Sequence, residues 1–214
     1  MLRLNGINWK VTNLGSNTLL LEPMILDGHL EYIHQFYQQI ESEPISEIVD
    51  VIPAYKSIAL FYQSTKENVI EILKQIDWTS LNAKTEQHHI VEVDYDLGLD
   101  WNRVCEVSKL SKSEIIERHA GTKYTVAMIG FLPGFIFLKG LELSISVPRL
   151  ENPRTAIPAG SIGIGGYQTG IYSLESPGGW NIIGKTTHQF FNMKNDPPIS
   201  ISPGDSLTFN PVNS

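Results

Sequence analysis

The chain has 214 residues, of which 42% are hydrophobic and 18% charged, and its formal net charge is −7. This length predicts one large domain or two small ones, and the apolar content is sufficient for a buried core. The negative charge and the lack of a lysine- or arginine-rich cluster argue against nucleic-acid binding.

The first half of the chain, up to about Asp77, alternates strand-like and helix-like segments. Two strands are expected on either side of the turn LGSN, and Asp27 is expected to cap a helix over GHLEYIHQFYQQIE. Two more β-prone runs, SEIVDVIPAY and SIALFYQ, precede a second helix that starts after Thr65. The order ββαββα predicts a small α+β domain over residues 1–80, with two helices covering one face of an antiparallel sheet.

Residues 81–214 are expected to form a second, β-rich domain that begins with short helices. A polar linker that includes His88 and His89 leads into a strand, IVEVDYD, and two helices follow. The second of these helices carries a capping signal formed by Ser111 and Glu114. After Thr122, short β-prone runs alternate with glycines and prolines, which is typical of a barrel or a sandwich.

Two features predict a cytoplasmic protein without a membrane partner. The single cysteine, Cys105, excludes an internal disulfide and fits a reducing compartment. The first residues, MLRLNGINWKV, lack the apolar core of a signal peptide, and no run of 18 apolar residues is present.

One segment, Gly179–Thr186, fits the phosphate-binding pattern G-x-x-x-x-G-K-[ST] but not its context. A P-loop needs a helix directly after the lysine, so that backbone N–H groups can surround phosphate. Here the variable positions are Trp, Asn, Ile and Ile, which favour a strand, and the following THQFFNMKNDPP is a poor helix. We therefore expect the edge of a β-hairpin, with Lys185 in a strand or turn.

Three motifs together resemble the allophanate hydrolase subunit 1 family. They are GFLPGFIFLKGL, the segment from Val147 to Thr186, and SPGDSLTF. Members of this family include the B subunit of bacterial 5-oxoprolinase and the KipI inhibitor of a sporulation histidine kinase. The resemblance is strong over residues 90–210 and looser before them. It implies a small N-terminal α+β domain followed by a C-terminal cyclophilin-like β-barrel.

The chain departs from the family pattern at three places. Asp94–Gly98 replaces a Cys-Tyr-Gly-Gly-like segment, Gly134–Leu138 replaces Gly-Phe-Pro-Tyr-Leu, and Lys185 replaces an arginine. These departures remove no polar group that the site needs.

The resemblance implies an ATP-dependent opening of 5-oxoproline to L-glutamate, shared among three subunits. The lactam oxygen is phosphorylated in that scheme and the activated ring is hydrolysed, which requires cations and oxyanion donors. This chain shows no complete set, which agrees with a site that partners complete. The implied partners are a second hydrolase subunit (allophanate hydrolase subunit 2, or the C subunit of 5-oxoprolinase) and a LamB/YcsF-type A subunit. The implied cofactor is ATP with Mg²⁺, bound mainly in the assembled complex.

The candidate catalytic residues are His119 and Arg154. His119 could transfer protons near neutral pH, or it could be a helix C-terminal histidine bonded to backbone carbonyls. Arg154 and Arg149 flank LENP and could hold a carboxylate or phosphate through paired hydrogen bonds. The alternative for both arginines is structural pairing with Glu142, Glu151 or loop carbonyls.

Further candidates would bind the substrate. Gln168 and Tyr172 could donate hydrogen bonds into a pocket or belong to a plain hairpin, and Ser176 could be a turn or pocket donor. Ser176 is not expected to be a nucleophile, because the Gly-x-Ser-x-Gly pattern is missing. Phe131, Phe135, Phe137 and Trp180 could form an apolar wall or pack in the core. No histidine, cysteine and carboxylate cluster has metal-ligand spacing, so no metal site is expected.

Two alternatives to a component of 5-oxoprolinase stay open. One is a KipI-like inhibitor that docks on the helical dimerisation domain of a sensor kinase, and the other is a component of an allophanate or urea-derivative amidohydrolase. An exposed apolar patch without a polar pocket would favour the inhibitor. A pocket holding Arg149, Arg154, His119 and Gln168 would favour the enzyme.

Overall fold

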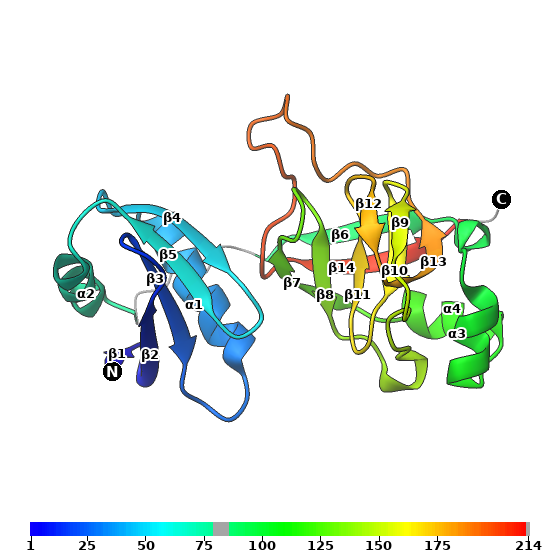
Figure 1. Cartoon of the computed structure of the whole chain (residues 1–214), viewed down its shortest axis with the longest axis horizontal. Helices are drawn as coiled ribbons and strands as arrows, with labels where there is room; N and C mark the ends of the chain where they lie inside the picture. Colours follow the sequence, from blue (N-terminus) through cyan, green and yellow to red (C-terminus); the bar gives the residue numbers. More distant parts are fainter. Residues whose placement is uncertain (79–85, 213–214) are drawn as a thin grey trace. The chain divides into compact units, whose positions relative to one another are not determined.

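The computed structural model describes residues 1–78 and 86–212 (Figure 1). Contacts divide the chain into two compact units, Met1–Thr85 and Glu86–Ser214. The expected boundary between residues 80 and 81 lies in the segment 79–85, outside the described residues. No helix in the described ranges is long and apolar enough to cross a membrane.

The N-terminal unit is an antiparallel sheet covered by two helices (Figure 1). Its strand order is β1-β2-β3-β5-β4. Side chains from both helices and from the sheet share one core cluster, which includes Trp9, Phe36 and Leu73. The elements are β1 (Leu2–Leu4), β2 (Ile7–Asn13), β3 (Thr18–Pro23), α1 (His29–Ser42), β4 (Ile48–Pro53), β5 (Ile58–Tyr62) and α2 (Lys66–Gln75).

The order in this unit is βββαββα, so the expected ββαββα omitted the first strand. Strand β1 pairs with β2 through a two-residue turn, Asn5-Gly6, whose φ angles of 47° and 74° are both positive. Positive φ at both central positions matches the type I′ turn that joins tight hairpins. The pairing buries Leu2 and Leu4 in the core.

The two helices differ in how they begin. Thr65 caps α2 as expected, because its side chain accepts a hydrogen bond from the backbone N–H of Asn68. The expected cap of α1 is wrong: Gly28 occupies the N-cap position with φ 76°, and no side chain caps this helix. Asp27 instead accepts a hydrogen bond from the N–H of Gly28.

The C-terminal unit is a seven-stranded curled sheet with the strand order β13-β10-β11-β8-β7-β14-β6. Paired hydrogen bonds between Asp94 and Lys185, both 2.9 Å, join the end of β6 to β13, so the two edge strands meet. This confirms a curled β architecture, while the likeness to cyclophilin stays a prediction. A separate two-stranded sheet pairs β12 with β9.

The elements of this unit include short helices as well as strands. They are β6 (His88–Val93), η1 (Tyr95–Leu97), α3 (Trp101–Ser108), α4 (Lys112–Ala120), β7 (Tyr124–Ile129), β8 (Ile136–Lys139), η2 (Leu143–Ile145), β9 (Arg154–Ile157), β10 (Ser161–Ile164), β11 (Thr169–Ile171), β12 (Ser176–Gly178), β13 (Asn181–Lys185) and β14 (Ser206–Pro211).

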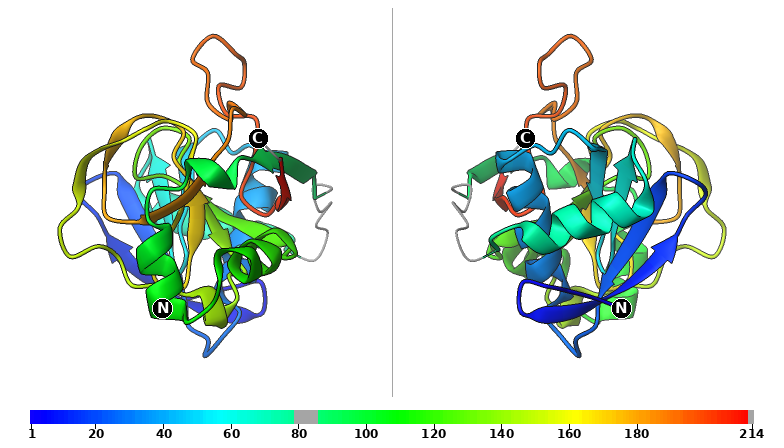
Figure 2. Two further views of the ribbon diagram at one scale, coloured as in Figure 1. Left: turned by 90° about the vertical axis from the view of Figure 1, so that its right-hand side faces the viewer. Right: turned by 90° about the vertical axis from the view of Figure 1, so that its left-hand side faces the viewer.

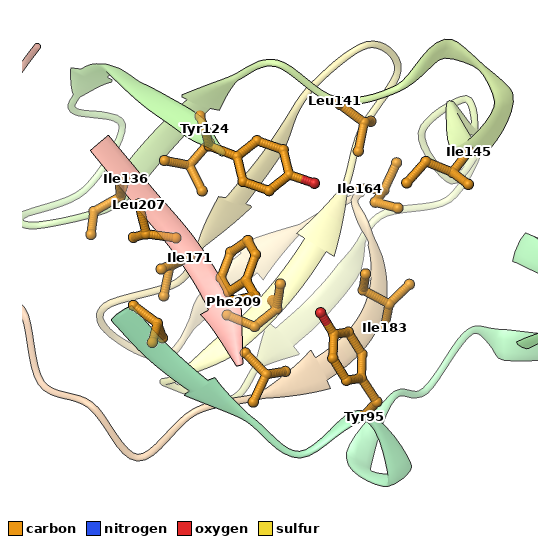
Figure 3. Close-up of a cluster of buried hydrophobic side chains, with 14 of the residues drawn as sticks. Tyr95, Tyr124, Ile136, Leu141, Ile145, Ile164, Ile171, Ile183, Leu207 and Phe209 are labelled. Carbon is orange, nitrogen blue, oxygen red and sulfur yellow. The ribbon is translucent and has the colours of Figure 1, made fainter. Parts of the chain in front are cut away.

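Aromatic and branched side chains fill the inside of the curled sheet. Tyr95, Tyr124 and Phe209 lie among aliphatic residues from the surrounding strands (Figure 3). Helix α4 has the expected capping box between Ser111 and Glu114. His88 and His89 are not in a linker, because both belong to β6, which pairs in parallel with β14.

The Gly179–Thr186 segment is not a P-loop. It runs into strand β13, which pairs with β10, and no helix follows Thr186 within the described residues. Gly184 is needed for packing, since an added Cβ would lie 2.8 Å from a methyl group of Val93. The expected hairpin is wrong, because β12 pairs with β9 instead of β13. The loop after β13 stands away from the curled sheet (Figure 2).

Candidate functional site

A cavity of about 320 Å³ in the C-terminal unit is lined mainly by aromatic rings. We call it the aromatic pocket. Phe131 and Phe135 come from the β7–β8 loop, and Tyr172 directly follows β11. Trp180 directly precedes β13. The complete lining is Phe131, Phe135, Phe137, Arg149, Pro153, Tyr172, Pro177, Gly178, Gly179 and Trp180.

Phe135 lies at the centre of the aromatic pocket's wall. Its ring centroid is 4.8 Å from that of Tyr172 and 5.4 Å from that of Trp180, and both pairs are nearly perpendicular. Phe131 meets Phe135 in the same edge-to-face manner at 5.7 Å. This arrangement brings the positive edge of one ring to the negative face of the next, which fixes the rings relative to one another.

Arg149 supplies the cation of the aromatic pocket. Its guanidinium carbon lies 5.7 Å from the centre of the Trp180 ring, and the side chain is exposed. No carboxylate of the described residues forms an ion pair with it. An arginine stacked on an aromatic ring keeps its N–H groups available, so Arg149 can receive a ligand carboxylate.

Tyr172 adds a hydroxyl group to the pocket wall. Burial raises its pKa, while the backbone N–H of Trp180 and the charges of Arg149 and Arg154 act in the opposite direction. The net direction is upward, so the hydroxyl keeps its proton at neutral pH and can donate a hydrogen bond.

Arg154 does not line the aromatic pocket. Its guanidinium donates two hydrogen bonds to Asp100, at 2.6 and 3.0 Å. Asp100 also accepts a 2.7 Å hydrogen bond from the backbone N–H of Ile182. This pairing matches the structural alternative for Arg154, although the partner is Asp100 and not Glu142 or Glu151.

The structure places His119 in the core of the curled sheet, away from the aromatic pocket. The side chain has no solvent exposure, and its ring stacks on Phe209 with centroids 4.6 Å apart. Burial lowers the pKa of His119 to about 3. Exchange of a proton with a substrate is therefore not supported, and the expected acid/base role is corrected to a core role.

Both ring nitrogens of His119 have hydrogen-bond partners. The oxygen of Thr169 lies 2.9 Å from Nε2 and donates its own proton to the Gly163 carbonyl, so Nε2 carries the hydrogen. Nδ1 then accepts from the Tyr95 hydroxyl at 2.7 Å. The alternative prediction, that backbone carbonyls bind the His119 ring, is also wrong, because both partners are side-chain hydroxyls.

Gln168 and Ser176 lie outside the aromatic pocket's lining. Gln168 is half-buried in the turn between β10 and β11, where its backbone carbonyl accepts a hydrogen bond from the backbone N–H of Gly165. The Ser176 hydroxyl donates to the carbonyl of Pro177 at 3.2 Å. Of the nine expected site residues, the pocket gathers Phe131, Phe135, Arg149, Tyr172 and Trp180.

Sequence reasoning missed two parts of this region. Pro177, Gly178 and Gly179 line the pocket with backbone and small side chains, and the SPGG run was the available signal. The pairing of Asp100 with Arg154 could not be predicted, because 54 residues separate them and no motif links the two segments.

A second cavity, of about 850 Å³, lies between the β13 end and the loop that follows it. It carries Lys185, Lys194 and His188, but its lining has no Asp or Glu that could bind Mg²⁺. The aromatic pocket likewise has one cation and no carboxylate. Neither cavity fits MgATP by itself. No group of three or more His, Cys, Asp or Glu side chains in the described part of the chain is arranged to hold a metal ion.

Known proteins give consistent matches. The family model described as "Carboxyltransferase domain, subdomain C and D" matches residues 9–201. The B subunit of 5-oxoprolinase from Bacillus subtilis is 32% identical over 95% of this chain and 92% of its own length. The protein of the same name from Haemophilus influenzae is 35% identical over 81% of this chain and 83% of its own. These relatives confirm the relationship that the motifs indicated.

Solved structures match as well. TTHA0988 is 28% identical with a TM-score of 0.80, and the match covers 92% of this chain but 40% of that one. PH0987 of Pyrococcus horikoshii is 34% identical with a TM-score of 0.58, over 95% and 98% of the two chains. The urea amidolyase of K. lactis is 16% identical with a TM-score of 0.73, over 97% of this chain and 15% of that one, which shows a common fold alone. The chain therefore belongs to the carboxyltransferase domain, subdomain C and D, family, together with proteins named as the B subunit of 5-oxoprolinase.

Proposed function

We propose that the chain is the B subunit of a multi-subunit, ATP-dependent 5-oxoprolinase, and that the aromatic pocket binds 5-oxo-L-proline. The observation that carries this proposal is the cation of Arg149 at a pocket whose other walls are aromatic rings, prolines and glycines. Similarity to three proteins named as the B subunit of 5-oxoprolinase supports the same substrate.

The chemistry of the pocket matches that of the lactam. 5-Oxoproline is a small five-membered ring with apolar methylene groups, one amide and one carboxylate. The aromatic walls suit the ring, and Arg149 suits the carboxylate through charge-assisted hydrogen bonds. The protonated Tyr172 hydroxyl supplies a donor for a ligand oxygen.

The chain has the features of one part of a larger enzyme. The aromatic pocket and the cavity beside the loop after β13 both lack the carboxylates that MgATP needs. TTHA0988 is about two and a half times as long as the segment it shares with this chain. In that protein, a related fold is therefore part of a longer polypeptide. We propose that a second hydrolase subunit and a LamB/YcsF-type A subunit supply the missing groups and the ATP site.

The two alternatives have less support. The exposure of Phe131, at 69%, offers an apolar contact that a kinase inhibitor could use. The same pocket carries Arg149, however, so the face is not purely apolar. An amidohydrolase acting on urea derivatives has the support of a shared fold only.

The test is formation of ADP and glutamate from ATP and 5-oxoproline. We expect no turnover by the chain alone and turnover with its partner subunits. Arg149→Ala should raise KM for 5-oxoproline by about tenfold or more, because a charged hydrogen bond to the carboxylate is lost. Arg3→Ala, an exposed arginine of β1, is the matched control and should leave KM unchanged. Absence of turnover in the complete mixture would contradict the proposal.

A further inference from the structure

Phe131 has a backbone conformation that is unusual for a bulky residue. Its φ angle is 70°, in the left-handed region where a Cβ atom crowds the following carbonyl. Two other non-glycine residues in the described ranges share a positive φ. Asn5 lies in a hairpin turn and Lys109 at the end of α3, where such angles are common. Phe131 has no comparable explanation from its place in the fold.

The loop around Phe131 is held by contacts that do not involve its side chain. The N–H of Gly130 donates to the carbonyl of Phe135, and the N–H of Phe135 donates to Leu132, both at 3.2 Å. The hydroxyl of Ser173 donates to the Pro133 carbonyl at 2.5 Å. The backbone angle at position 131 is therefore imposed by the loop, and a glycine would fit it without strain.

The ring of Phe131 contributes little to the core. It is 69% exposed, although it lines the aromatic pocket and contacts the edge of Phe135. Folding gains little from an exposed ring, while the backbone conformation is unfavourable for any residue with a Cβ. A strained residue whose side chain lines a pocket points to a function in that pocket.

We propose that Phe131 is the specificity-determining wall of the aromatic pocket. Its ring packs against the apolar face of the bound lactam and limits the pocket to a five-membered ring whose carboxylate reaches Arg149. This inference rests on the proposed function, since it concerns the ligand of the same pocket.

The test uses the assembled complex of the full chain with its partner subunits. KM and kcat are measured for 5-oxoproline and for its six-membered homologue, 6-oxopiperidine-2-carboxylate. We expect Phe131→Gly to raise KM for 5-oxoproline about fivefold, to leave kcat within about twofold, and to reduce discrimination against the larger ring about fivefold. Phe131→Tyr keeps the ring and should retain the wild-type values.

Thermal unfolding separates this role from a structural one. Phe131→Gly should not lower the melting temperature by more than about 2 °C, because relief of strain offsets the lost ring contact. Lys109→Gly is the matched control: it relieves the same backbone conformation far along the chain from the pocket loop and should leave both KM values unchanged.

The outcomes distinguish this inference from the function on which it rests. If the wild-type complex does not turn over 5-oxoproline, both are overturned. If it does, but Phe131→Gly keeps the wild-type KM and the wild-type discrimination, only the role of Phe131 is overturned. A fall in melting temperature of more than about 5 °C would show that the ring serves the fold instead.

Discussion

Acid is expected to destabilise the C-terminal unit through His119. The side chain is fully buried, and burial lowers its pKa to about 3, whereas a histidine in an unfolded chain has a pKa of about 6.5. Above pH 6.5 the histidine is neutral in both states, so its contribution to stability is complete. As the pH falls below 6.5, the unfolded chain binds a proton that the folded one does not, and stability is lost.

The size of this effect follows from the two pKa values. Between pH 7 and pH 5 the unfolded state gains about 2 kcal/mol from protonation of one histidine, at ~1.4 kcal/mol for each pH unit below 6.5. The result in this window does not depend on the exact folded pKa, as long as that pKa is well below 5. His188 acts in the same direction, because burial and the nearby His89 lower its pKa.

The assay is urea denaturation at pH 7 and pH 5 for the wild type and for His119→Gln. Glutamine does not titrate, so the variant should lose about 2 kcal/mol less between the two pH values, even if it is less stable at pH 7. Contributions from His188 and the other histidines cancel in this difference. If the free energy of unfolding fell equally in both proteins between pH 7 and pH 5, the reasoning would be refuted. An imidazole NMR signal of His119 that titrates near pH 6 would refute it as well.

Two further predictions concern basic residues that are separate from the aromatic pocket. Arg154→Ala should lower the free energy of unfolding by about 2 kcal/mol in urea denaturation, because it leaves Asp100, which is 8% exposed, without its cation. Arg154→Lys should recover part of this loss, and an unchanged stability of Arg154→Ala would contradict a structural role. Lys185→Ala should leave ATP turnover of the assembled complex within a few-fold of wild type, because Lys185 lies in β13 and not in a P-loop. A fall in ATP turnover of about a hundredfold or more would instead support a phosphate-binding role for Lys185.

Local sequence signals predicted most of the elements, and the failures have physical causes. Periodicity and caps were sufficient for α2 and α4, whose capping residues Thr65 and Ser111 act as expected. Strand β1 was missed although Asn5-Gly6, between alternating apolar residues, is a strong hairpin signal. The cap of α1 was assigned to Asp27 because an acidic residue is common there, whereas the chain uses a glycine in the left-handed region.

The site was less predictable because burial depends on distant segments. Aromatic residues of the family motifs were expected to form a wall, and Phe131, Phe135 and Trp180 do so. His119 had an overlooked local signal: it lies one turn after Ile115, which is fully buried, and so on the inner face of α4. Arg154 had no local signal, because its partner Asp100 is far away in the sequence.

Gly165, which directly follows β10, and Gly170 of β11 lead to a final prediction about how the pocket is built. A Cβ added to Gly165 would lie 2.6 Å from the Trp180 ring, and one added to Gly170 would lie 3.1 Å from it. Both positions therefore need glycine because the indole of Trp180 packs closely against their backbone, and Gly165→Ala must displace the ring. We expect this variant to lose about 1–3 kcal/mol in urea denaturation and to raise KM for 5-oxoproline, although Gly165 does not line the pocket.

Gly179→Ala is the matched control for stability, because its added Cβ would meet neighbours only at 3.5 Å or more. Normal stability and KM in Gly165→Ala would mean that the indole can move without consequence, and the pocket would then not depend on a fixed Trp180. A loss in Gly165→Ala alone would instead show that the glycine at position 165 is needed to seat the Trp180 ring beside the cation of Arg149.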